Sequence, residues 1–204
     1  KFGKERIAVV KTDYVASQFS KSLVSQSIIL VVLTLLLIWI YATIRFKWDF
    51  ALGAVLAIIH DALIMVAVIT FMQMEFNSIT IAAILTIIGY SINDTIVVLD
   101  RVRENIKLVK VEKFSDILDL SQTEILSRTI ITTVTTLLAV ISLFIFTSGS
   151  MKDFALALII GMISGIYSTI FITGFFVALV RKNWKPSDEE KKTQVTTFSE
   201  EVTE

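Results

Sequence analysis

The chain has 204 residues and no net charge, with 19 basic and 19 acidic residues, and 54% of its residues are hydrophobic. An average soluble domain contains about 45–50% apolar residues even with glycine counted. The mean hydropathy of +0.75 is therefore too high for a single buried core. The balanced charge offers no long-range field that would attract nucleic acid. Without cysteine, and with one histidine, the sequence predicts no disulfide and no metal site.

Five apolar stretches are each close to the roughly 20 residues that cross a bilayer as a helix. They cover residues 27–44, 50–72, 77–99, 129–147 and 154–180. The segments 45–49 and 73–76 are so short that they predict tight turns between antiparallel helices. The expected fold class is an all-α membrane protein with five transmembrane helices.

Basic residues in the connecting segments predict the orientation. With the amino-terminal end of the first span outside, thirteen of the 19 basic residues fall inside. A chain that starts outside needs an earlier span, so we expect a preceding helix and an extracytoplasmic domain. The predicted organisation is the end of that domain at 1–24, a transmembrane bundle at 25–182, and a disordered cytoplasmic tail at 183–204, which is polar and charged.

The long internal segment 100–127 carries a second helical pattern. Apolar residues recur at helical spacing beside charged ones at Phe114, Ile117, Leu118 and Ile125. This pattern predicts an amphipathic helix on the cytoplasmic membrane surface. Ser121 and Glu124 have the spacing of a capping box, which predicts that the fourth span begins near Gln122.

His60 and Asp61 lie near the middle of the second predicted span. A charged side chain at this depth costs about 2.5–3.5 kcal/mol, so it is a functional candidate by default. Gly53 and Ala57 make a small-residue stripe on the Asp61 face, which predicts that this face packs against protein. The pair either binds a proton or holds two helices together by hydrogen bonds, and the sequence leaves both open.

Asn93 and Asp94 occupy the inner third of the third predicted span, and Arg128 enters the membrane from the same side on the next one. A polar stripe follows Arg128 at intervals of three and four residues, beginning with Thr132. We predict a proton pathway here, because burial disfavours a charged carboxylate and a nearby guanidinium restores it. The alternative is that Arg128 extends to the surface and the hydroxyls only pack helices. Gly161 and Gly165 form a GxxxG pattern on the fifth span, which indicates packing.

Three segments resemble the SecF family of protein-export membrane proteins, within the resistance-nodulation-division superfamily. They are GYSINDTIVVLDRVREN at 89–105, RFKW at 45–48 leading into His60 and Asp61, and LSRTIITT at 126–133. The resemblance implies a six-helix bundle of which helices 2–6 are present. It matches Asp94 and Arg128 to the proton-pathway carboxylate and arginine of the family, and His60 and Asp61 to positions in its pattern.

The resemblance also implies partners and a location. They are a SecD heterodimer partner, the SecYEG channel, YajC, YidC and the translocating polypeptide, in the bacterial cytoplasmic (inner) membrane. No cofactor and no nucleic acid are expected, and the chain would be a proton-driven translocation component rather than an enzyme. Two alternatives remain open: an exporter of a small molecule or lipid from the same superfamily, and a purely structural translocon subunit.

Overall fold

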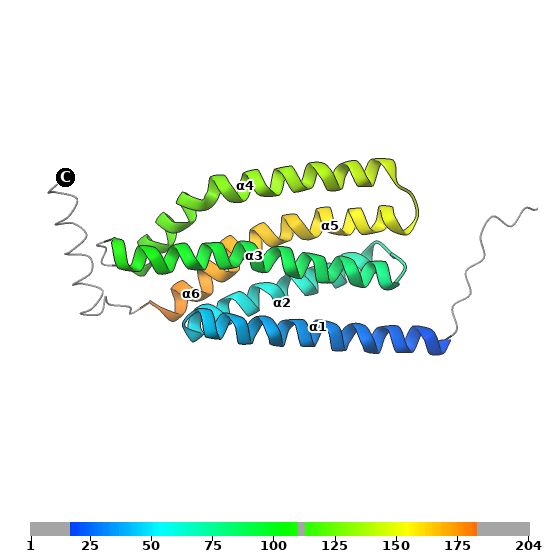
Figure 1. Ribbon diagram of the computed structural model, residues 1–204, viewed down its shortest axis with the longest axis horizontal. Coiled ribbons are helices and arrows are strands. Elements are labelled where there is room, and N and C mark those ends of the chain that lie inside the picture. The colour runs from blue at the N-terminus through cyan, green and yellow to red at the C-terminus, as the bar shows by residue number, and fades with distance from the viewer. Residues whose placement is uncertain (1–16, 110–112, 183–204) are drawn as a thin grey trace, which may run out of the picture.

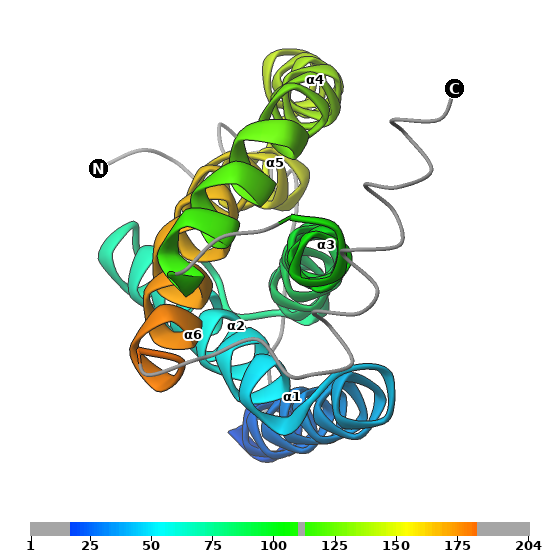
Figure 2. The same cartoon turned by 90° about the vertical axis from the view of Figure 1, so that its left-hand side faces the viewer.

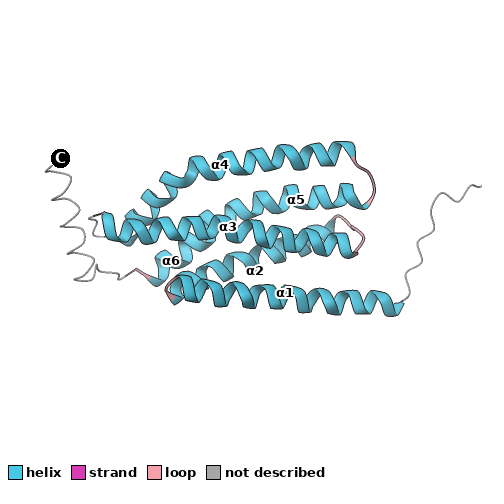
Figure 3. Cartoon of the chain, viewed as in Figure 1, coloured by secondary structure: helices cyan, strands magenta, loops and turns pink. Residues whose placement is uncertain are grey.

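The computed structural model describes residues 17–109 and 113–182, and within these ranges it contains helices and no strand (Figure 3). The predicted disordered tail lies outside the described residues, as do residues 1–16 of the predicted domain junction and positions 110–112.

Five long helices account for the described chain (Figure 1). They are α1 (Ser17–Arg45), α2 (Trp48–Phe71), α3 (Ser78–Leu108), α4 (Phe114–Phe146), and α5 (Ser150–Tyr167) with its continuation through the π-helix η2 (Ser168–Thr173) into α6 (Gly174–Val180). Each of the five is long and apolar enough to cross a membrane. The predicted all-α membrane fold with five spans is confirmed.

The helix ends follow local chemistry. Only Phe46 and Lys47 separate α1 from α2, as the predicted tight turn requires. The side chain of Asn77 caps α3 by accepting hydrogen bonds from the backbone N–H groups of Ile79 and Thr80 at 2.9 and 3.1 Å. At its other end α3 continues to Leu108, beyond the predicted limit at 99. The predicted limit is the point at which the apolar residues end. Helix α3 continues beyond it through charged residues, which are favourable where a helix leaves the membrane and meets water.

The fourth span begins earlier than predicted, because α4 is continuous from Phe114. Ser121 lies inside this helix and donates its hydroxyl to the Ile117 carbonyl at 2.6 Å. The predicted capping box and the helix start near Gln122 are therefore wrong. The amphipathic pattern itself is present in the first turns of α4, where Phe114 and Ile117 are buried and Asp116 is exposed.

Helix α3 packs against α2, α4 and α5, while α1 lies at the edge of the bundle beside α2 (Figure 2). The predicted GxxxG packing is confirmed: a Cβ atom added at Gly161 would meet Ile87 at 2.6 Å and Met65 at 2.7 Å. Apolar side chains along α1 and the outer face of α4 remain exposed. These faces suit lipid or another membrane subunit.

Candidate functional site

Asp61 lies on α2 in the centre of the bundle, and its exposed fraction is 0%. Gly53 and Ala57, on the same face of α2, are also buried, and Gly53 lies against Val177 of α6. The small residues let neighbouring helices approach this face closely. The prediction that Asp61 faces protein rather than lipid is confirmed.

Three serine hydroxyls from the facing helices donate to the Asp61 carboxylate. Ser91 of α3 and Ser168 of η2 both donate to Oδ2, at 2.5 and 2.6 Å, and Ser164 of α5 donates to Oδ1 at 3.1 Å. Hydrogen bonds to an ionised group are stronger than those between neutral groups. Asp61 therefore joins α2, α3, α5 and η2 through one carboxylate.

His60 is a weaker neighbour of the same carboxylate. Its Nδ1 lies 3.3 Å from Asp61 Oδ1, and its side chain is about one third exposed. The ring also lies near Tyr167, with ring centroids 6.2 Å apart. His60 is thus at the rim of the site while Asp61 is inside it.

Asp94 lies three residues after Ser91 on α3 and is 8% exposed. Its carboxylate accepts no hydrogen bond and forms no ion pair with any described residue. Arg128 lies on α4, which packs against α3. The structure does not show the predicted ion pair between Asp94 and Arg128 in this conformation.

The other predicted pathway residues lie on the outside of the described chain. Asn93, Arg128 and Thr132 are all exposed. The Thr132 hydroxyl donates to the Arg128 carbonyl of its own helix at 2.9 Å. The predicted polar stripe on α4 therefore faces away from the bundle, and Asn93 does not share a site with Asp94.

The π-helix η2 adds polar groups next to the Asp61 site. Thr95 of α3 and Thr169 of η2 lie 3.0 Å apart through their hydroxyls, both buried. Gln122 of α4 donates its amide to the Ile170 carbonyl at 2.8 Å. π-Helical turns are rare and occur frequently at functional sites. Here the turn brings a hydroxyl of the fifth span to Asp61.

The sequence prediction missed these hydroxyls. Ser164 and Ser168 are four residues apart on the fifth span, and Ser91 is part of the quoted 89–105 motif. Serine is common on helix-packing faces, so only their convergence on Asp61 makes them informative.

A buried charge pair, also missed, closes the end of the bundle at which α2 begins and α6 ends. Arg181, just after α6, donates to Asp49 in the first turn of α2, and the two side chains are 9% and 7% exposed. The guanidinium lies 4.3 Å from the centre of the Phe50 ring and 5.1 Å from that of Phe114. This cluster joins the starts of α2 and α4 to the end of α6.

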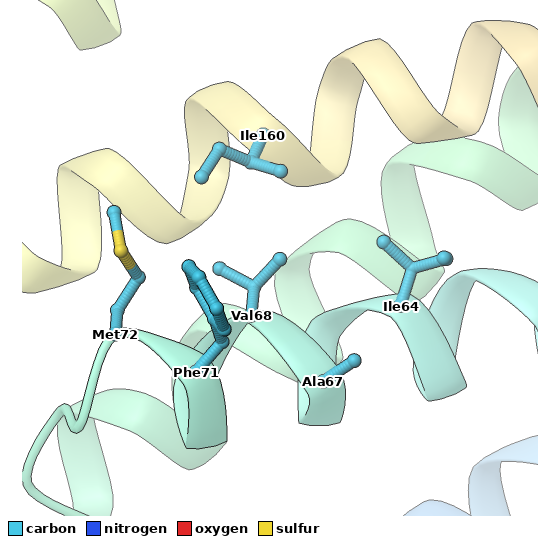
Figure 4. A pocket seen from close by; sticks show the side chains of 6 residues that line it. All are labelled: Ile64, Ala67, Val68, Phe71, Met72 and Ile160. Atoms are coloured by element: carbon cyan, nitrogen blue, oxygen red, sulfur yellow. The ribbon is translucent and has the colours of Figure 1, made fainter.

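An apolar groove of about 450 Å³ lies between α2 and α5, far along α2 from Asp49 (Figure 4). Its lining is entirely apolar: Ile64, Ala67, Val68, Phe71, Met72 and Ile160. It offers no group for acid–base chemistry.

Among the described residues no three histidine, cysteine, aspartate or glutamate side chains are grouped so as to hold a metal ion. The buried Asp61 and Asp94 carboxylates are groups that can bind a proton.

Comparisons with known proteins agree with this architecture. Residues 1–183 match the family model for the protein export membrane protein SecD/SecF, C-terminal. The chain is 52% identical over 181 residues to a protein translocase subunit SecF from Treponema pallidum, covering 89% of this chain and 43% of that protein. It is 46% identical to the SecF subunit of Borreliella burgdorferi, covering 81% of this chain and 56% of the relative.

Solved structures show the same fold. The crystal structure of SecDF, a translocon-associated membrane protein from Thermus thermophilus, superposes with a TM-score of 0.77 at 38% identity, over 83% of this chain and 24% of that one. A SecDF structure in a super-membrane-facing form gives a TM-score of 0.75 at 34% identity, over 90% of this chain and 23% of that one. The chain spans about half the length of the curated relatives it matches. It belongs to the SecD/SecF family of protein export membrane proteins.

Proposed function

We propose that this chain forms the membrane part of a SecF subunit, which pairs with SecD and uses the proton gradient to drive late steps of protein export. It would lie in the bacterial inner membrane beside the SecYEG channel, with YajC and YidC as further partners and its carboxyl terminus in the cytoplasm. In this arrangement residues 1–24 end an extracytoplasmic domain and 183–204 form a cytoplasmic tail. The translocase names of the relatives and the SecDF structures support the assignment.

The single observation that carries the mechanism is the state of Asp94. It is a buried carboxylate without a hydrogen-bond donor among the described residues, and Arg128 lies on the neighbouring helix α4. Burial disfavours the charged form, and approach of a cation favours it. A change in helix packing that alters the distance to Arg128 would therefore bind or release a proton at Asp94.

The exposed polar residues support a partner at this face. Asn93 and Arg128 are exposed on the described chain. An arginine that faces lipid within a span is costly, and the cost reaches about 2.5–3.5 kcal/mol at the bilayer centre on the insertion scale. Cover by a second membrane subunit would remove that cost, and SecD is the partner that the family suggests.

The test is Asp94→Asn in the full-length protein with its partners, reconstituted so that an imposed proton gradient stimulates export. Asparagine keeps the size and polarity of the side chain but cannot carry the proton. We expect the gradient-stimulated component to be lost while SecD still co-purifies. Arg128→Lys should also lose most of it, because lysine has no planar fork to bridge both carboxylate oxygens.

A matched control is Asp100→Asn, on the same helix. Asp100 forms an ion pair with Arg45 at 2.6 Å in which both side chains are more than one third exposed. Its removal should leave stimulation unchanged. Wild-type stimulation in the Asp94→Asn protein would refute the mechanism. Loss of SecD from the purified protein would show a structural role instead.

A further inference from the structure

Two buried carboxylates, Asp61 on α2 and Asp94 on α3, have opposite surroundings. Asp94 has no donor among the described residues, whereas Asp61 accepts bonds from Ser91, Ser164 and Ser168. A purely structural carboxylate needs donors in one fixed arrangement. The contacts of Ser168 allow a second arrangement at Asp61.

Ser168 has two acceptors for its single hydroxyl proton. Its Oγ lies 2.6 Å from Asp61 Oδ2 and 3.1 Å from the Gly165 carbonyl oxygen. A hydroxyl donates one hydrogen bond and can accept two. When Asp61 is ionised, Ser168 donates to Oδ2. When Oδ2 carries a proton, Asp61 donates to Ser168 Oγ, and Ser168 turns its own proton to Gly165. Both states leave these groups satisfied.

Asp61 is fully buried, so a proton must reach it through other side chains. Ser91 bonds to Asp61 Oδ2 and precedes Asp94 by three residues. Residues three apart on a helix are neighbours on one face. The other titratable groups nearby are His60 on α2 and Tyr167 on α5 beside it. The remaining contacts from α5 and η2 are the serine hydroxyls.

We propose that Asp61 is a second proton-binding site, which exchanges its proton with Asp94 by way of Ser91 and signals its occupancy through Ser168. Asp94 does not bond to Ser91 in this conformation, so the transfer begins with a turn of the Asp94 side chain to Ser91 Oγ. Asp94 then gives its proton to Ser91 Oγ, and Ser91 gives its own proton to Asp61 Oδ2, so the serine is unchanged. When Asp61 is protonated, Ser168 donates to the Gly165 carbonyl instead of to Asp61. This change of hydrogen bond occurs at the start of η2, which leads into α6. This proposal rests on the proposed function of Asp94.

The experiment is infrared difference spectroscopy between acidic and neutral pH on the full-length protein in its complex. A protonated carboxylic acid has its own C=O stretching band. We expect Asp61→Asn to remove one band and Asp94→Asn to remove a different one. Ser168→Ala should move the Asp61 band to higher frequency, because the acid loses its hydrogen-bond acceptor. Thr169→Val, on the same π-helical turn but bonded to Thr95, should leave the band in place.

The outcomes separate this proposal from the proposed function. Gradient-stimulated export in Asp61→Asn should fall at least tenfold while SecD still co-purifies. If no band depends on Asp61 and Ser168→Ala leaves the spectrum unchanged, the second site is refuted, even when Asp94→Asn abolishes stimulation. Ser168→Ala keeps the carboxylate, so it tests the site if Asp61→Asn fails to assemble. Wild-type stimulation in Asp94→Asn would refute the proposed function whatever the Asp61 band shows.

Discussion

Removing Asp49 should destabilise the bundle far more than removing an exposed partner of an ion pair. The Asp49 carboxylate is the anion that pairs with Arg181, and both side chains are less than 10% exposed. In Asp49→Ala the guanidinium stays buried between the rings of Phe50 and Phe114 without a counter-charge. An uncompensated buried charge is the costly result of breaking such a pair.

The magnitude follows from the burial. Breaking a buried ion pair by removing one partner costs about 3–5 kcal/mol. For a chain of this size 1 kcal/mol corresponds to roughly 2–4 °C in Tm, so the expected loss is about 6–20 °C. The control is Asp100→Ala, which breaks the exposed pair with Arg45. Exposed pairs contribute about 0.2–1 kcal/mol, so this variant should lose no more than about 4 °C.

The assay is thermal unfolding of the purified protein in detergent, for the two single variants, Arg181→Ala, and the double variant Asp49→Ala/Arg181→Ala. The double variant should be more stable than the sum of the two single losses predicts, by about 1–3 kcal/mol, because it buries no lone charge. Equal losses in Asp49→Ala and Asp100→Ala would refute the reasoning. So would strict additivity in the double variant.

Two further predictions concern packing and topology. Gly161→Ala should destabilise the bundle by about 1–3 kcal/mol, because its Cβ meets Ile87 and Met65 below 3 Å, whereas Gly89→Ala, which meets nothing within 4 Å, should not. Thermal unfolding of the two variants checks this, and equal stability would contradict it. Asp116→Cys should not react with an impermeant thiol reagent added outside intact cells but should react after permeabilisation, since this exposed residue is expected to face the cytoplasm. Labelling from outside would overturn the predicted orientation.

The spans were readable from sequence because a bilayer-crossing helix must be long and apolar, and this constraint acts on each segment separately. The same is true of the face that Asp61 presents, since Gly53 and Ala57 mark it at helical spacing. The start of α4 was misjudged because the Ser121–Glu124 spacing is a local signal. In the structure, contacts with another helix use these two side chains instead: Asn105 of α3 donates to both Ser121 and Glu124. Helix α4 is continuous through both residues.

The sequence by itself determined the five spans, the family resemblance and the two intramembrane carboxylates, since hydropathy and motif order are properties of the linear chain. Only the tertiary structure decided which side chains meet. It brought Ser91, Ser164 and Ser168 to Asp61, joined Asp49 to Arg181 across 132 positions, and turned Thr132 outward. These outcomes depend on how the helices rotate and cross. The rotation of each helix is set by the packing of its complete apolar face against the neighbouring helices. The position of a polar residue in the sequence therefore does not specify which side chain it contacts.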